Sequence, residues 1–392
     1  MLKNNWWIPL MGLMIVTGCF GTDNENAEDN QENDENHPEE SNDVQDGEDY
    51  SALDLSIEGI VSFSGMDGMG YTDGNAEETQ FNHPADIIQF DEGFLIADSG
   101  NHLIRYVSMS GQSETFAGGY ESYDEYGEPE GDFTDGERGD ARFDTPLGLI
   151  FDEESDTVYV ADAENGAIRS IAEDGNVETL TEELEYPTSL VILEGNLIVS
   201  DAGSHRILQI DLSSGDMAVL AGGDYEQGDG REIGRFADGQ GEDAGFNEPF
   251  GLAVSGENII VADSGNQRIR QVTGEGEVTT IAGTGENLIP GADYIAPGTE
   301  DGPIAEAQFH FPRSVEVLAD GAILVADTYN HRIRLIMNGE VIPVAGHGVH
   351  GLEDGSVEEA LFDGPYGLAV FDERMWVTDH WNHMIREIEL TH

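Results

Sequence analysis

A nine-residue motif occurs six times along the chain, and this repetition constrains the fold more than any other feature. In each copy an aspartate ends a short apolar run, a polar turn follows, and an isoleucine lies near the start of the next apolar run. The copies occupy residues 97–105, 161–169, 200–208, 262–270, 326–334 and 378–386. Repetition on this scale is typical of solenoids, propellers and arrays, so the repeating unit has to be interpreted before any single residue.

Each repeating unit carries the same order of signals around the motif. An aromatic-x-x-Pro segment opens the unit, and four short apolar runs follow it, separated by Gly, Asn and Asp turns. The opening segments are 81–84, 143–146, 246–249, 309–312 and 362–365, with a shortened Tyr186-Pro187 in the third unit. Short β-branched runs without helical periodicity predict four antiparallel strands, which make one propeller blade.

The spacing of the motif and the two chain ends predict how the blades close into a ring. The steps between successive motif aspartates are uneven, which indicates loop insertions between intact blades. The last unit stops at His392 after three strands, whereas residues 59–65 have the pattern of a fourth strand and precede an Asp73-Gly74 loop. The sequence therefore predicts an all-β, six-bladed propeller of four-stranded blades, closed by an N-terminal strand that completes the last blade and removes its open edge.

The motif Val-Ala-Asp-x-x-Asn-His-Arg-Ile-Arg resembles the NHL repeat, whose name matches Asn101-His102-Leu103 in the first copy. The resemblance covers about residues 55–392. It departs at Gly166, Ser204 and Leu208, but the flanking apolar runs remain there, so all six blades are expected.

The first residues resemble a bacterial lipoprotein signal. Lys3 precedes an apolar run at 6–17 that is short for a bilayer span, and residues 16–19 (Val-Thr-Gly-Cys) resemble a lipobox. This resemblance implies cleavage before Cys19, the only cysteine, and lipid attachment to it; the alternatives are an uncleaved anchor or a chance cysteine. The expected organisation is a signal peptide at 1–18, a lipidated cysteine with an acidic disordered tether at 19–54, and the propeller at 55–392. Phe20 after the cysteine favours the outer membrane or cell surface over the inner membrane.

The chain is extremely acidic. It has 81 acidic residues, 15 basic ones and a formal net charge of −66, which becomes −67 once Lys3 leaves with the signal. Such a surface repels phosphate backbones and anionic headgroups, so no nucleic-acid partner is expected, and contact with a membrane runs through the lipid anchor. A saline habitat explains this charge, and calcium capture is the alternative. The acidic stretch with Asp224, Asp229, Asp238 and Asp243 lacks the strict spacing of a calcium loop.

Strand alternation places the motif turns and the long insertions on one face of the propeller, which is the candidate binding surface. The insertions are 118–142, 222–245, 283–308 and 346–361. The motif aspartate is expected to make a turn hydrogen bond to the backbone, and the motif arginines to pair with carboxylates between blades. The motif histidines are expected to be structural as well.

The start of each innermost strand, just after the opening proline, is expected to line the central channel. Among these positions Asp86, Phe250, Arg313 and Tyr366 form a charged and aromatic set suited to a small polar ligand, although such side chains also serve as a plug. His380 and Trp381 replace small turn residues and form a second candidate site.

The enzymatic alternative comes from resemblance to other six-bladed propellers. Gluconolactonase-like hydrolases and an amidating lyase built of NHL repeats place metal ligands around the channel, and His83, His310 and Asp86 are the matching candidates here, with calcium or zinc as the implied cofactor. No serine nucleophile elbow, cysteine nucleophile or nucleotide fingerprint is present. The sequence thus favours a surface-anchored, cofactor-free scaffold that binds a small polar ligand or a protein without catalysis. The alternative is a metal-dependent hydrolase or lyase.

Overall fold

The computed structural model describes residues 56–66, 68–125, 127–223, 226–228, 231–371 and 373–391. The expected signal peptide, Cys19 and the acidic tether lie outside these residues. In the described part of the chain, no helix is long and apolar enough to cross a membrane.

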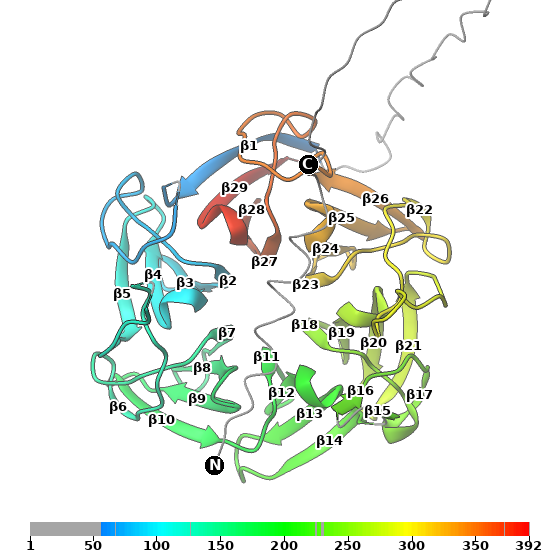
Figure 1. Cartoon of the computed structure of the whole chain (residues 1–392), viewed down its shortest axis with the longest axis horizontal. Helices are drawn as coiled ribbons and strands as arrows, with labels where there is room; N and C mark the ends of the chain where they lie inside the picture. The colour runs from blue at the N-terminus through cyan, green and yellow to red at the C-terminus, as the bar shows by residue number, and fades with distance from the viewer. Residues whose placement is uncertain are drawn as a thin grey trace, which may run out of the picture. The chain divides into compact units, whose positions relative to one another are not determined.

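Six radial sheets surround a central axis, so the prediction of an all-β, six-bladed propeller is confirmed (Figure 1). The blades are numbered in chain order, and their strands are given from the channel outward. Blade 1 contains β2 (Pro84–Phe90), β3 (Gly93–Asp98), β4 (Leu103–Ser108) and β5 (Ser113–Gly118); blade 2 contains β7 (Pro146–Asp152), β8 (Thr157–Asp162), β9 (Ala167–Ile171) and β10 (Asn176–Thr181); and blade 3 contains β11 (Pro187–Leu193), β12 (Asn196–Asp201), β13 (Arg206–Asp211) and β14 (Met217–Gly222). Blade 4 contains β18 (Pro249–Ser255), β19 (Asn258–Asp263), β20 (Arg268–Thr273) and β21 (Glu277–Ala282); blade 5 contains β23 (Pro312–Val317), β24 (Ile323–Asp327), β25 (Arg332–Met337) and β26 (Glu340–Ala345); and blade 6 contains β27 (Pro365–Phe371), β28 (Arg374–Asp379), β29 (Met384–Thr391) and β1 (Ser56–Ser64).

Each innermost strand begins at the opening proline. Proline has no N–H to donate, and the innermost strand is an edge strand of its sheet, so the residue costs no ladder hydrogen bond there. In every blade this proline pairs with the motif aspartate at the end of the second strand, as Pro84 does with Asp98. The channel mouth and the motif turns therefore share one face.

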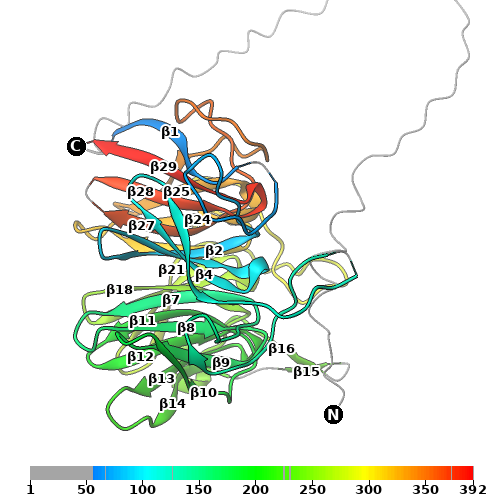
Figure 2. The ribbon, with the colours of Figure 1, turned by 90° about the vertical axis from the view of Figure 1, so that its left-hand side faces the viewer.

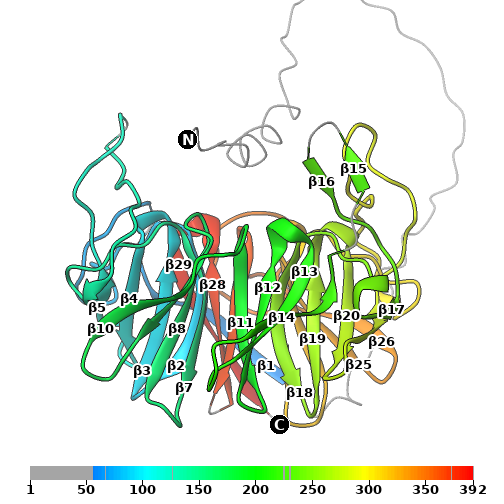
Figure 3. The same ribbon diagram turned by 90° about the horizontal axis from the view of Figure 1, so that it is seen from below.

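The insertions at 118–142, 222–245 and 283–308 project from that same face, as the two side views show, whereas the insertion at 346–361 pairs with β1 through Gly355 (Figure 2, Figure 3). Three of the insertions also contain a two-residue strand that pairs with the outermost strand of the blade that follows the insertion. One of these insertions carries a small hairpin as well. These short elements are β6 (Gly136–Glu137), β17 (Gly239–Gln240), β22 (Gly302–Pro303) and the hairpin β15 (Glu226–Gly228) and β16 (Arg231–Ile233). Single 3-10 turns are η1 (Ser99–Asn101), η2 (Ala202–Ser204), η3 (Gly241–Asp243), η4 (Ser264–Asn266), η5 (Thr328–Asn330) and η6 (His380–Asn382).

The N-terminal strand closes the ring as predicted. β1 pairs antiparallel with β29, so the last blade combines the two ends of the propeller (Figure 1). Ile60 is fully buried in the core between the last two blades, and Phe63 packs edge-on against Phe94 and Trp376. The backbone of Ile60 also exchanges two hydrogen bonds with Gly355, so both edges of β1 are bonded.

The motif aspartate organises its own blade. Asp98 Oδ1 accepts the backbone N–H of Asn82 at 2.7 Å, while Oδ2 accepts hydrogen bonds from Asn101 Nδ2 and the Arg105 guanidinium, both at 2.8 Å. The expected backbone hydrogen bond exists, but it reaches back 16 residues to the opening segment rather than closing a local turn. The aspartate therefore fixes the opening segment, the turn and the third strand to one another.

The motif arginines pair within a blade, so the prediction that they pair between blades was wrong. Arg105 bridges Asp98 of its own blade and Asp73 of the segment leading into that blade. The equivalent triads are Asp162, Arg169 and Asp135; Asp263, Arg270 and Asp238; Asp327, Arg334 and Asp301; and Asp379, Arg386 and Asp354. Burial raises the pKa of Asp162 to about 6, opposed by its hydrogen bonds and Arg169, so the carboxylate is still ionised at neutral pH.

The motif histidines join neighbouring blades. His102 Nδ1 accepts the backbone N–H of Thr145 at 3.0 Å, and Thr145 precedes the opening proline of the next blade with a left-handed φ of 56°. The equivalent pairs are His205 with Glu248, Gln267 with Phe311, His331 with Gly364 and His383 with His83. A strained backbone of this kind persists only where neighbours hold it, and the side-chain acceptor supplies that hold. The structural role expected for these histidines is confirmed.

Replacing His331 with glutamine tests this link and its pH dependence. Gln267 already makes the equivalent bond, so His331→Gln is expected to change the free energy of unfolding at pH 7 by less than about 1 kcal/mol. Burial, with His350 and His310 nearby, lowers the pKa of His331 to about 4, below the value near 6.5 of an unfolded chain. The unfolded chain therefore binds the extra proton between about pH 6.5 and 4, and wild type loses stability as the pH falls through that window.

Between pH 7 and pH 4 the free energy of unfolding of the wild type is expected to fall by roughly 2 kcal/mol more than that of His331→Gln, after allowing for partial solvent exposure of the ring. Asp363 lies 3.4 Å from Nδ1, but that nitrogen already accepts the Gly364 N–H and carries no proton to share. Urea unfolding of both proteins at pH 7 and pH 4 measures the difference. Identical pH dependence in the two proteins would contradict the assigned role.

Candidate functional site

Apolar and aromatic residues that follow the opening prolines meet at the channel mouth. A buried cluster joins Ala85, Leu147, Phe250 and Tyr366, contributed by four different blades. Phe250 and Tyr366 pack edge to face with ring centroids 5.8 Å apart. The sequence-based choice of these two positions therefore corresponds to a real cluster.

Arg313 lies on this aromatic cluster. Its Cζ atom is 3.9 Å from the ring centroid of Phe250 and 5.6 Å from that of Phe311, which are distances of cation–π contact. No hydrogen bond or ion pair joins its guanidinium to another described residue. Burial lowers the pKa of Arg313, but the neighbouring Tyr366 and Glu248 raise it by more than burial lowers it. The net shift of the pKa is upward, so the guanidinium stays charged.

An arginine without a polar partner is unusual in this chain. Among the arginine side chains that the structure describes, Arg138 and Arg313 alone have guanidinium groups with no hydrogen bond or ion pair to another described residue. The others bind aspartates, glutamates or backbone carbonyls. In a protein of net charge −66 carboxylates are abundant, yet neither of these two guanidinium groups is paired with a carboxylate of another described residue.

Further aromatic rings continue from this cluster and unite the two candidate sites predicted from sequence. Tyr366 stacks on His380 with centroids 4.6 Å apart and 19° between the planes. Trp381 packs on Tyr329 at 5.0 Å, and Tyr329 in turn lies 5.4 Å from Phe311. We call the set Phe250, Phe311, Tyr329, Tyr366, His380 and Trp381 the aromatic collar.

Sequence reasoning missed several neighbours of Arg313. Tyr329 occupies a turn position that holds glycine in three other blades, and this substitution was a visible signal. Tyr294 comes from the insertion at 283–308, and its hydroxyl donates a 2.6 Å hydrogen bond to Glu248. Tyr294 is close enough to Arg313 for an electrostatic interaction only because the insertion folds back over the channel mouth side of the propeller.

Asp86 bonds to the backbone rather than standing free at the mouth. Its carboxylate accepts N–H hydrogen bonds from Ile87 at 2.9 Å and from Leu149 of the next blade at 2.8 Å. Burial raises the pKa of Asp86 to about 7, although the two backbone N–H donors favour the carboxylate and oppose this rise. Through these hydrogen bonds Asp86 links blades 1 and 2.

The candidate metal ligands His83 and His310 contact different members of the aromatic collar. His83 contacts His380 and His383, with ring centroids 4.9 and 4.6 Å away, whereas His310 packs against Phe311 and Tyr329. Burial lowers the pKa of both His83 and His310 to about 4.

No three His, Cys, Asp or Glu side chains in the described ranges are arranged to hold a metal ion. In the acidic stretch considered for calcium, Asp224 and Asp229 lie outside the described residues. Asp238 binds Arg270 and Thr280.

Comparisons with known proteins agree with the repeat and the fold. The family described as NHL repeat matches this chain at residues 246–272 and 309–334. Human NHL repeat-containing protein 2 is 27% identical over 344 residues, which cover 77% of this chain and 45% of that protein. Protein SUPPRESSOR OF QUENCHING 1, chloroplastic, of Arabidopsis thaliana is 28% identical over 289 residues, or 66% of this chain and 26% of that protein. The chain thus spans less than half the length of these curated relatives.

Solved structures share the propeller at low sequence identity. An auxiliary nutrient binding protein from Bacteroides thetaiotaomicron VPI-5482 matches with a TM-score of 0.63 and 15% identity, covering 86% of this chain and 77% of that one. A gluconolactonase from Xanthomonas campestris matches with a TM-score of 0.51 and 10% identity, covering 79% of this chain and 87% of that one. At such identity the likeness shows the fold alone.

Proposed function

We propose that this chain is an extracytoplasmic propeller, held at a bacterial outer membrane or cell surface by a lipid on Cys19, that binds a small polar ligand or a partner protein at the channel mouth without catalysing a reaction. The observation that carries the binding role is Arg313. Its guanidinium is stacked on Phe250, surrounded by aromatic rings and free of any hydrogen bond or ion pair to a described residue.

The geometry around Arg313 suits an anionic group on the ligand. The stacked guanidinium keeps its N–H donors for a carboxylate or phosphate, and such charge-assisted pairs are among the stronger hydrogen bonds. The aromatic collar supplies flat apolar surface for the rest of the molecule, as in other small-molecule sites. The aromatic residues Tyr329 and Trp381 come from turns on the face with the long insertions, where propeller loops commonly carry function.

Fold alone does not separate binding from catalysis, because both a nutrient-binding protein and a gluconolactonase share it. The residues favour binding. A metal-dependent hydrolase needs several converging ligands, whereas His83 and His310 contact different members of the aromatic collar and Asp86 is bonded to backbone N–H groups.

Arg313→Met is expected to weaken any ligand found by screening a library of carboxylates and phosphates at least tenfold, or about 1.4 kcal/mol. The matched control is Arg374→Met, which removes the charge of an exposed arginine that pairs with Glu387 and should leave affinity unchanged. Isothermal titration measures both, and circular dichroism confirms that the variants fold. Metal-dependent turnover that disappears in His83→Ala or His310→Ala would instead establish the hydrolase or lyase alternative.

The anchor and the absence of a nucleic-acid partner rest on the sequence. Cys19 follows a lipobox-like segment, and the net charge of −66 opposes binding to phosphate backbones. Metabolic labelling with an alkyne fatty acid, followed by membrane fractionation, tests the anchor. A chain that takes up no label contradicts it.

A further inference from the structure

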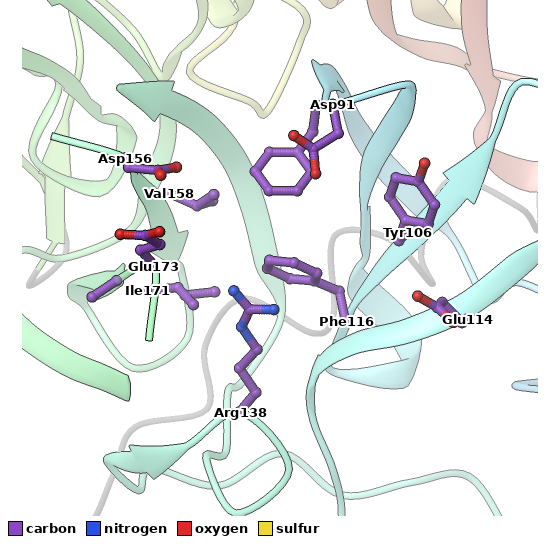
Figure 4. Close-up of a pocket in the computed structure, with 11 residues that line it drawn as sticks. Asp91, Tyr106, Glu114, Phe116, Arg138, Asp156, Val158, Ile171 and Glu173 are labelled. Carbon is purple, nitrogen blue, oxygen red and sulfur yellow. The ribbon is translucent and has the colours of Figure 1, made fainter. Parts of the chain in front are cut away.

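A groove between blades 1 and 2 forms a cavity away from the channel mouth. Its volume is about 470 Å³, within the range of roughly 300–1,000 Å³ that small-molecule sites occupy. One wall is lined by Tyr106 and Phe116 of blade 1 and the other by Val158 and Ile171 of blade 2 (Figure 4). Phe90 extends the apolar wall, since its ring lies 5.3 Å from that of Phe116.

Arg138 enters this groove from a fixed backbone. Its N–H donates to Gly175 O at 3.0 Å and its carbonyl accepts the N–H of Gly118 at 2.9 Å, so the residue is held between blades 1 and 2. The guanidinium lies 4.0 Å from the centroid of Phe116, and Figure 4 shows it directed into the space between the walls. Its Nε atom is buried without a hydrogen-bond partner among the described residues.

Carboxylates surround the same cavity. Asp91 and Glu114 come from blade 1, and Asp156 and Glu173 come from blade 2. None of the four forms a hydrogen bond or ion pair with another described residue. The lining therefore carries one unpaired cation and four unpaired anions, beside an aromatic surface.

Two charge arguments select the ligand class. A simple anion would suit Arg138 but would be repelled by the four carboxylates and by the protein as a whole. A simple cation would suit the carboxylates but would leave the Arg138 donors unused. A neutral molecule with separated positive and negative groups satisfies both, and an apolar body would cover Phe90 and Phe116.

We propose that this groove is a second binding site, for a small zwitterion with an apolar side chain such as an apolar α-amino acid. The ligand carboxylate pairs with Arg138, its ammonium group faces the carboxylates of Asp156 and Glu173, and its side chain packs on Phe90 and Phe116. The site is independent of the channel mouth, because it uses a different arginine and shares no lining residue with the buried cluster there.

The experiment titrates the full chain with L-phenylalanine, 3-phenylpropionate, which lacks the ammonium group, and 2-phenylethylamine, which lacks the carboxylate. L-Phenylalanine is expected to bind at least tenfold more tightly than either analogue. Arg138→Gln should remove that preference, whereas Arg374→Gln, with the same change of charge, and Arg313→Met should leave it intact. Asp156→Asn should weaken L-phenylalanine and leave 3-phenylpropionate unchanged or improved.

Three results would overturn the proposal. They are equal affinity for 2-phenylethylamine and L-phenylalanine, retention of L-phenylalanine affinity in Arg138→Gln, and no measurable heat with L-phenylalanine at millimolar concentration. Loss of binding in Arg313→Met but not in Arg138→Gln would move the amino acid to the channel mouth and also refute the second site.

Discussion

Deletion of residues 56–64 is expected to lower the free energy of unfolding by several kcal/mol or to cause aggregation. The deletion removes β1 and exposes the unpaired N–H and C=O groups of β29, which are a template for pairing with another chain. It also removes the bonds between Ile60 and Gly355 and uncovers the core between the last two blades. Because whole-protein stability is typically only about 5–15 kcal/mol, losses of this size are large.

Fluorescence reports on this blade directly. Trp376 is fully buried, packs on Phe94 at 4.5 Å and contacts Phe63 of β1 at 6.3 Å, so its emission should shift to longer wavelength in the truncated chain. A matched pair of point changes separates packing from strand loss. Ile60→Ala should cost about 2–4 kcal/mol, while Val61→Ala, at a half-exposed position on the other side of the same strand, should cost less than about 0.5 kcal/mol. Unchanged emission and melting temperature after the deletion would refute closure by β1.

The blade count, the strand order and the closure were predictable because each depends on local pattern. An opening proline and a motif aspartate recur in every unit, and strands that alternate with turns leave one arrangement for the ring. The motif histidines were correctly assigned to structure, but their partners were not foreseen. The bond from His102 to Thr145 requires the next blade to present a backbone N–H from a left-handed residue, which sequence pattern does not reveal.

The arginine partners and parts of the two candidate sites could not be predicted, because they depend on contacts between residues far apart in the sequence. Asp73 lies 32 residues before Arg105, and only the folding of the leading segment onto its own blade brings them together. The aromatic collar was predicted in part, because Phe250, Tyr366, His380 and Trp381 differ from the residues at the equivalent positions of other repeats, but its members Phe311 and Tyr329 were missed. Tyr294, which lies near Arg313, enters from an insertion. Arg138 belongs to no motif, and its groove exists only once two blades are packed side by side.

Asp263→Asn is expected to lower the free energy of unfolding by about 3–5 kcal/mol, whereas Asp238→Asn should cost less than about 1 kcal/mol. Both aspartates bind the guanidinium of Arg270, but Asp263 is fully buried and Asp238 is about half exposed, at 47%. An asparagine at 263 leaves the buried Arg270 without its buried counter-charge, and its amide donors would face the donors of Asn266 and Arg270. At 238, the amide oxygen can still accept from Arg270 and Thr280.

Blade 3 shows that the buried aspartate needs a guanidinium rather than an arginine at one fixed position. Leu208 replaces the motif arginine there, and Arg206 reaches Asp201 instead, with Nε 2.9 Å from Oδ2. Removing both charges together should therefore be less harmful than removing one. Asp263→Asn combined with Arg270→Leu is expected to be more stable than Asp263→Asn alone, because the buried guanidinium that has lost its buried counter-charge is removed as well. Urea unfolding of the four proteins in this double-mutant cycle measures the coupling. A double variant as unstable as the sum of its two single changes would show that the pair acts through packing, and not through charge.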